Sequence, residues 1–378
     1  MRAALLLAFV AGTGCCLDAL QEEQALPDAG PGFQPDASLI IAPIGSDAGA
    51  PPIACTAYAA PPLPTACPSP SVAAGGSLAL PTAQPVSSWA LATDGAGEAS
   101  FAFILGVTTD SLPWRVYLQR LSPGGVLLGP LNEIDLPEWG PLVALAASPV
   151  SHVLCWEDSS TTIACAAMPV GGGPVYPGLT VGGQLPAVAY GPAGFLFAYV
   201  ATDGSVTVQP LDCSARSAGA PTVVAGLTAD AVGLAASSTG YALVTGTAEG
   251  EGFAQFLSAS GTPQGAPVVL ANGFGSGSSL ALSGGILASP GGLHDSSGPV
   301  ASDASCAAAG GLDLFAPAAG ATFGSLCVSQ AGFGGQWLGG APLPDDLGDT
   351  AILLSSVPDG FLLATFGSEV GFAHLGCP

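Results

Sequence analysis

The chain has 378 residues, of which 49% are apolar, with a mean hydropathy of +0.56. That length and composition allow one large hydrophobic core or two smaller ones and exclude a wholly disordered chain. Only 8% of the residues are charged, and the formal net charge is −23 because four arginines face 27 acidic residues. Since binding to DNA or RNA requires several cationic side chains, this charge excludes a nucleic-acid partner.

The first residues have the pattern of a secretory signal. Arg2 supplies a positive charge, residues 3–10 form an apolar run, and small residues lead up to Cys15. The apolar run is too short to span a bilayer and suits the core of a signal peptide. We therefore predict a signal peptide over residues 1–14.

Thr13, Gly14 and Cys15 resemble the lipobox of bacterial lipoproteins, in which the cysteine is acylated and becomes the new N-terminus. The match is partial, because Gly12 stands where that family usually has leucine. The resemblance implies a lipid on Cys15 as the chain's only membrane contact. Cys16 occupies the place where aspartate favours the inner membrane, so the outer membrane is implied. Secretion or a periplasmic location is the alternative.

Residues 15–75 read as a tether. Asp-Ala pairs recur among prolines and glycines at residues 26–32, 35–37 and 46–49, without helical or strand periodicity. Such a composition buries too little apolar surface to offset the entropy of ordering. Pro-rich segments stay extended at about 3.1 Å per residue, so the arm would hold a domain away from a membrane. Its composition resembles the arms of Gram-negative envelope lipoproteins.

Residues 76–378 contain a repeated apolar run that opens on a bulky residue. Copies occupy residues 100–105, 151–156, 194–199, 240–245 and 360–365, with a weaker copy at 285–288. The steps between the bulky positions are 51, 43, 46, 45 and 75 residues. A period in the forties with several strands per unit is typical of a β-propeller. We predict an all-β fold, a β-propeller of about six blades.

Strands of small and branched residues precede most copies and suit the crowded axis of a propeller. They lie at residues 142–147, 187–190, 232–236 and 352–355. At the ends, residues 77–80 are predicted to supply the fourth strand of the last blade beside residues 371–375, which would leave no open edge. The 75-residue step holds an insertion near 295–340 or a seventh blade. Tandem β-sandwiches are the alternative fold.

Eight cysteines remain besides Cys15 and Cys16, an even number that suits disulfides in an oxidising compartment. Nearness in sequence ranks three pairs first and leaves a fourth: Cys55 with Cys67, Cys155 with Cys165, Cys306 with Cys327, and then Cys213 with Cys377. No Cys-x-x-Cys occurs, and the three histidines are not at zinc-ligand spacing, so we predict neither a metal nor a cofactor.

Few residues suggest catalysis. No Gly-x-Ser-x-Gly turn occurs, and His294, Asp295 and Ser296 are consecutive, which does not arrange a relay. A glycosidase needs two carboxylates in one cleft, and Glu157 with Asp203 is the pair whose convergence would indicate an enzyme. Trp139 lies in a predicted loop at a strand entrance and is the candidate for a binding face.

These observations together predict a non-enzymatic, exported and lipid-anchored binding or scaffold protein, with a protein or glycan of the cell envelope as its partner. No catalytic residue is assigned. The alternatives are an extracellular propeller enzyme of the glycoside hydrolase type, with carboxylates supplied by loops, and a structural spacer without a discrete ligand.

Overall fold

The computed structural model describes residues 53–58, 63–64, 71–80, 86–94, 97–105, 114–136, 142–270, 273–275, 278–290, 292–301, 312–318, 322–328, 335–337, 350–366 and 369–376. All regular secondary structure in these ranges is β-strand, which confirms the predicted all-β class. The described residues include no helix long and apolar enough to cross a membrane.

Antiparallel sheets follow one another along the chain. The first contains β2 (Val86–Thr93), β3 (Ala99–Leu105), β4 (Trp114–Leu121) and β5 (Leu127–Leu136). The next is a seven-stranded sheet with β6 (Val143–Ala147), β7 (Ser151–Ser159), β8 (Thr162–Pro169), β9 (Tyr176–Gly191), β10 (Gly194–Ala201), β11 (Val206–Leu211) and β12 (Thr222–Val223). Its 16-residue strand β9 pairs with β8 through its first half and with β10 mainly through its second half.

Three further sheets and part of a fourth follow. They contain β13 (Ala231–Ser237), β14 (Gly240–Gly246), β15 (Gly252–Leu257) and β16 (Val268–Leu270); β17 (Ala281–Ser283), β18 (Ile286–Ser289), β19 (Gly292–Asp295) and β20 (Gly298–Ala301); β21 (Leu312–Ala318), β22 (Thr322–Val328) and β23 (Gly335–Trp337); and β24 (Thr350–Val357), β25 (Gly360–Phe366) and β26 (Val370–Gly376). Neighbours in each sheet run antiparallel, because short turns connect them.

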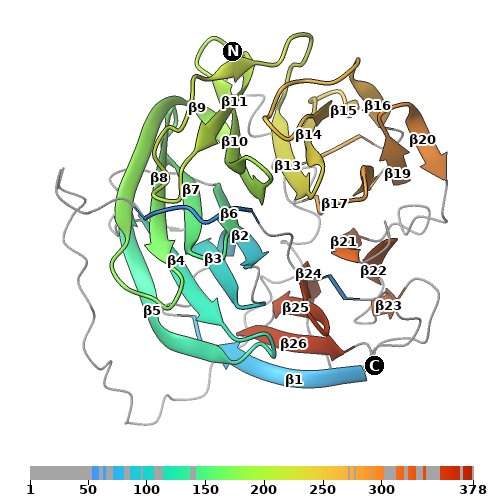
Figure 1. The fold of residues 1–378 in the computed structure, drawn as a ribbon. Coiled ribbons are helices and arrows are strands. Elements are labelled where there is room, and N and C mark those ends of the chain that lie inside the picture. Colours follow the sequence, from blue (N-terminus) through green and yellow to red (C-terminus); the bar gives the residue numbers. More distant parts are fainter. Residues whose placement is uncertain are drawn as a thin grey trace, which may run out of the picture. The chain divides into compact units, whose positions relative to one another are not determined.

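The sheets are arranged around a common centre (Figure 1). The innermost strands contact one another in the order β2, β6, β9, β13, β17, β21 and β24, and β24 in turn contacts β2. The arrangement is that of a β-propeller, in which the first strand of each unit lies at the axis. The predicted axial strands are found here, in β6, β9, β13 and β24.

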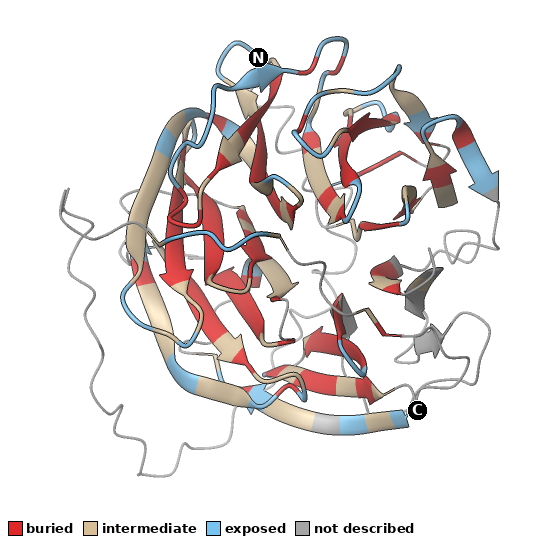
Figure 2. Ribbon diagram, in the orientation of Figure 1, coloured by how far each residue is buried: buried red, intermediate tan, exposed pale blue. Residues whose placement is uncertain are grey.

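The bulky second strands form the interior of the sheets. Every residue of β3 and β14 is buried, as are all but the last residue of β25. Figure 2 shows buried residues concentrated in these middle strands, whereas innermost strands such as β2 and outermost strands such as β12 contain intermediate and exposed residues. Facing sheets share their cores: Phe101 and Phe103 of β3, for example, pack in one cluster with Leu362 and Phe372. Continuous burial explains why these runs are apolar at nearly every position, with Ser100, Thr245 and Thr365 as buried polar exceptions.

The N-terminal strand completes the last sheet. Strand β1 (Ser71–Leu78) pairs antiparallel with β26, so that the sheet order is β1, β26, β25, β24. This confirms that an N-terminal strand joins the C-terminal one. The ladder has a register shift between Ala74 and Ser77, where Gly75 lies against the carbonyl oxygens of Gly124 and Phe372. A Cβ at Gly75 would lie 2.8 Å from Gly124 O, which explains the glycine.

Two ranges differ in detail from their expected content. The range 295–340, expected as an insertion, contains β20 and the three-stranded sheet β21–β23. The range 15–75, expected as a tether, includes the beginning of β1 at Ser71 and a short described segment at residues 53–58, which is attached to the sheets as set out below.

A buried glutamine recurs in the third strands. Gln119 of β4 donates through Nε2 to the carbonyl oxygens of Arg120 and Leu128, at 2.9 and 3.2 Å. Gln255 of β15 donates in the same way to Phe256 and Gln264, both at 2.9 Å. Each buried amide thereby holds the hairpin that leads to the fourth strand, and the recurring Gln-x-Leu spacing is the sequence signal for it.

Candidate functional site

The described residues surround a partly open cavity of about 210 Å³ at the centre of the ring. Its wall is made of residues near the C-terminal ends of the innermost strands, where these ends converge. The lining residues are Tyr58, Ala92, Thr93, Leu145, Ala146, Ala147, Val188, Ala189, Tyr190, Leu234, Ala235, Ala236, Leu280, Ala281, Leu282 and Pro317. We call this space the axial cavity.

The innermost strands present their edges, not their faces, to the axial cavity. Successive side chains of a strand point to opposite sides, so a strand that turned one face to the cavity would contribute every second residue. Instead, three consecutive residues line the wall in β6 (145–147), in β9 (188–190) and in β13 (234–236). β6 and β13 end their sheets, and this half of β9 pairs only with β10. Main-chain N–H and C=O groups of these edges therefore face the cavity.

Small side chains make that approach possible. Alanine occupies six of the lining positions in β6, β9, β13 and β17, including Ala146, Ala189 and Ala235. With only a methyl group at these places, little side-chain volume separates the main chain from the cavity. The small residues predicted for the axial strands therefore leave main-chain N–H and C=O groups accessible from the cavity.

One lining residue comes from far away in the sequence. Tyr58 belongs to the segment Ile53–Tyr58, which we call the arm, and its ring centroid lies 5.4 Å from that of Tyr190, with the planes tilted by 53°. Burial raises the pKa of Tyr58 above its ordinary value, and the neighbouring Tyr190 raises it further. Both phenol groups are therefore neutral at physiological pH.

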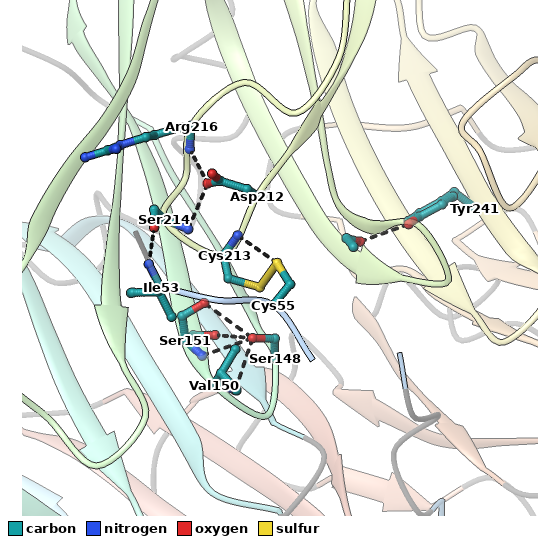
Figure 3. Close-up of a disulfide and its surroundings, with 11 residues drawn as sticks. Ile53, Cys55, Ser148, Val150, Ser151, Asp212, Cys213, Ser214, Arg216 and Tyr241 are labelled. Carbon is teal, nitrogen blue, oxygen red and sulfur yellow. Dashed lines mark hydrogen bonds between the residues drawn. A yellow bond between two sulfur atoms is a disulfide. The ribbon is translucent and has the colours of Figure 1, made fainter. Parts of the chain in front are cut away.

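A disulfide fastens the arm (Figure 3). Cys55 is bonded to Cys213 in the turn after β11, with a Cα–Cα distance of 5.3 Å. Next to it, Ile53 N donates to Ser214 Oγ at 2.6 Å, and Cys213 N donates to Cys55 Sγ at 3.0 Å. Ile53 also packs against the core cluster that contains Ala146 and Cys213. The arm is thus held at one end by β11 and reaches the axial cavity at the other.

The predicted cysteine pairs have mixed outcomes. Cys155 and Cys165 are bonded across the β7–β8 hairpin, with a Cα–Cα distance of 4.1 Å, which confirms that prediction. The pairs Cys55–Cys67 and Cys213–Cys377 are wrong, because Cys55 is bonded to Cys213. Nearness in sequence failed there because the fold brings the arm against a turn 158 residues away. Cys67, Cys306 and Cys377 lie outside the described residues, as do Cys15 and Trp139.

The two carboxylates considered for catalysis serve the main chain instead. Glu157 is buried and accepts a hydrogen bond from Leu185 N at 2.8 Å, at the point where β9 passes from β8 to β10. Leu185 has a φ of 58°, so this bond supports a left-handed turn. Asp203 accepts from Ser205 N at 2.9 Å in an exposed turn. Neither residue lines the axial cavity.

His294 and Asp295 lie in different surroundings. His294 is buried in β19, whereas Asp295 accepts hydrogen bonds from Ser297 N and Oγ in the following turn, at 2.7 and 2.6 Å. In the part of the chain that the structure describes, no three His, Cys, Asp or Glu side chains are grouped to hold a metal ion.

The axial cavity is electrically neutral. None of the described residues that line it carries a charge, and its polar side chains are Thr93, Tyr58 and Tyr190. Thr93 Oγ1 lies 3.2 Å from Ser355 Oγ of the neighbouring strand β24. Such a wall can offer hydrogen bonds and aromatic contacts but no ion pair, which suits binding of an uncharged group.

Comparisons with known proteins add a likeness of fold only. The sequence matches no model of a protein family and no curated protein. Among solved structures, the Dos1 propeller is similar, with 9% sequence identity over 81% of this chain and 96% of the other, and a TM-score of 0.45.

Proposed function

We propose that this is an exported, lipid-anchored binding protein of the cell envelope, and that the axial cavity is its ligand site. The observation that carries the proposal is the neutral cavity itself, where main-chain edges from several sheets and two tyrosine rings converge. The partner would be an envelope protein or glycan. A lipid on Cys15 would hold the protein at the outer membrane. Two disulfides support an oxidising compartment outside the cytoplasm.

We also propose that the ring has seven blades. Strand β9 would end one blade with its first half and begin the next with its second half, so the seven-stranded sheet would count as two blades. The three-stranded sheet β21–β23 would be a further blade in the long step of the repeat. Phe323 of β22 divides that step into 37 and 38 residues, close to a regular spacing.

Lipid attachment is tested by metabolic labelling with a palmitate analogue in a Gram-negative host that expresses the full chain. The wild-type protein and Cys16→Ser are expected to take up the label and to fractionate with the outer membrane. Cys15→Ser is expected to do neither. Equal labelling of Cys15→Ser would overturn the anchor.

Ligand binding is tested by thermal unfolding of the oxidised full chain with envelope glycans and with envelope protein fragments. A ligand at 100 times its dissociation constant adds about 2.7 kcal/mol, which raises the unfolding midpoint by several degrees. The rise should disappear in Ala189→Leu, which enlarges a residue of the lining, and persist in Ala193→Leu, which alters a turn away from the lining. A panel without any shift would indicate a spacer without a ligand.

A further inference from the structure

The composition of the axial cavity restricts the chemistry of what it can hold. An anion would find no cationic side chain among the described lining residues and would approach a chain with a formal net charge of −23. A cation would find no carboxylate in the lining. Because moving an ion out of water without a partner is costly, the lining selects against charged groups of either sign.

The main-chain edges of the wall also exclude purely apolar ligands. Three consecutive residues from each of β6, β9 and β13 turn their strand edges to the space. Each strand edge carries main-chain donors and acceptors that bind water when the cavity is empty. A purely apolar ligand would displace this water and offer no hydrogen bonds in its place. An occupant with several hydroxyl groups can bond to edges on different sides of the cavity at once.

The volume of the cavity and its two tyrosine rings further restrict the size and shape of the ligand. A space of about 210 Å³ is large enough to admit one substituted six-membered ring. The Tyr58 and Tyr190 rings are tilted by 53° to each other and supply flat apolar surfaces beside the polar edges. A ring with one face of C–H groups and a rim of hydroxyl groups matches both kinds of wall.

We propose that the axial cavity binds one neutral, hydroxyl-bearing ring, a single sugar residue at the end of a glycan, packed against Tyr58 and Tyr190. This inference rests on the proposed function and names the ligand class of the same site. Tyr58 is the residue that sets the specificity, because the arm brings it to the wall. The Cys55–Cys213 bond holds the arm in place and positions Tyr58 without touching the sugar.

The test is calorimetric titration of the oxidised full chain with probes of similar size. Methyl glycosides of neutral hexoses and of N-acetylhexosamine are the expected ligands. The comparison probes are a uronic acid, an amino sugar with a free ammonium group, and toluene as an apolar ring without a hydroxyl group. At least one neutral glycoside is expected to bind at least tenfold more tightly than each comparison probe.

Variants locate the binding. Tyr58→Ala is expected to weaken it about tenfold, since aromatic packing of this kind has about that effect. Tyr58→Phe keeps the ring and should retain most of the affinity. Tyr176→Ala removes a tyrosine at the other end of β9, outside the cavity lining, and should leave affinity unchanged. An unaltered unfolding midpoint and an intact Cys55–Cys213 bond show that Tyr58→Ala has folded.

The outcomes separate the two proposals. Tighter binding of toluene or of a charged sugar, lost in Tyr58→Ala, would overturn the neutral-sugar class and leave the axial cavity as the ligand site. Neutral glycosides that bind equally to Tyr58→Ala would overturn the role of Tyr58. Absence of binding by every probe, together with a glycan or protein that shifts the unfolding midpoint, would overturn this inference and retain a binding function elsewhere.

Discussion

Cys55 and Cys213 are joined across 158 residues of sequence, and this bond attaches the arm to the turn after β11. Cys55 is exposed, so Cys55→Ser removes a cross-link and little packing. We expect the variant to lose about 2–5 kcal/mol of unfolding free energy, because an open chain regains the entropy of a long closed loop. Urea unfolding of the oxidised protein measures the loss. Thr56→Ser is the matched control, and an unchanged midpoint for Cys55→Ser would contradict the prediction.

Glu157 is expected to show a pH dependence opposite to that of most carboxylates. Burial raises its pKa above the ordinary value, which outweighs the lowering effect of the hydrogen bond from Leu185 N. A raised native pKa means that the native state binds the proton more tightly than the unfolded state, so stability falls as the pH rises through that interval. Glu157→Gln can still accept the Leu185 bond and should remove this fall.

The measurement for Glu157 is the unfolding free energy from pH 4 to pH 8 for the wild type and two variants. Glu157→Gln should be at least as stable as the wild type at pH 8. Glu157→Ala leaves Leu185 N without its acceptor and should lose roughly 1–3 kcal/mol at every pH. A Gln variant that is much weaker than the wild type at pH 8 would refute the account.

His152 is expected to destabilise the protein in mild acid. Burial lowers its pKa to about 4, with a smaller effect of the Arg120 guanidinium, and neither ring nitrogen has a hydrogen-bond partner in the described structure. The unfolded chain, with a histidine pKa near 6.5, therefore takes up a proton between about pH 6.5 and 4 that the native state does not. Stability falls over that window as the pH falls, by up to roughly 3 kcal/mol.

His152→Leu should remove this loss, since leucine has no proton to gain and no unpaired nitrogen to bury. Unfolding curves at pH 8, 6, 5 and 4 compare the two proteins, and the values at pH 8, where His152 is neutral in both states, give the baseline. An equal fall of stability in His152→Leu between pH 6 and pH 4 would assign the acid sensitivity to other groups.

Two glycines in turns, Gly125 and Gly204, allow the energetic cost of a left-handed backbone to be measured apart from the cost of a steric clash. Gly125 has a φ of +78°, and an added Cβ would lie 3.0 Å from Phe372 Cβ. Gly204 has a φ of +84°, with nothing within 4 Å of such a Cβ. Gly204→Ala should therefore cost only the left-handed strain, about 1–2 kcal/mol. Gly125→Ala should cost more, and equal losses in urea unfolding would show that Phe372 yields freely.

The glutamine of the third strand is expected to stabilise its hairpin. Gln255 is buried, and its Nε2 bonds to the Phe256 and Gln264 carbonyls. Gln255→Ala removes the side-chain donor from Gln264 O, whereas Phe256 O still accepts from Gln264 N at 2.8 Å, and the variant should cost roughly 1–3 kcal/mol. Gln264→Ala removes an exposed amide from the same hairpin and is the control, since only the main chain of Gln264 is used. Hydrogen exchange of the β15–β16 amides locates the effect, and equal exchange in both variants would contradict it.

The strands that are buried on both faces were predictable because each contains a continuous apolar run opened by a bulky residue. Phe195 and Phe361 are examples, and both are fully buried second-strand residues. The strands β21–β23 were predicted only as one alternative for the 75-residue step, because Gly324 and Ser325 interrupt the apolar run that follows Phe323. Regular spacing alone, without the run, did not distinguish a strand from a loop.

The site was predictable only in part, for a different physical reason. Small residues in β6, β9 and β13 indicated crowded axial strands, which form most of the cavity wall. Tyr58 was missed because its neighbours are alanines and prolines, a composition typical of a linker. Its position depends on a disulfide between distant cysteines, and neither local propensity nor sequence nearness encodes such a contact.

The pairing of β1 with β26 joins Ser71 to Gly376, near opposite ends of the sheet domain. In a chain that emerges from a ribosome or a translocation pore N-terminus first, β1 therefore stays without its partner until β26 has emerged. The last sheet can therefore form only in a chain that contains β26. In a chain truncated before β26, both β1 and β25 have an unpaired edge. Such a fragment would expose apolar strand edges and be a ready target for quality-control proteases, whereas the full chain has that edge covered.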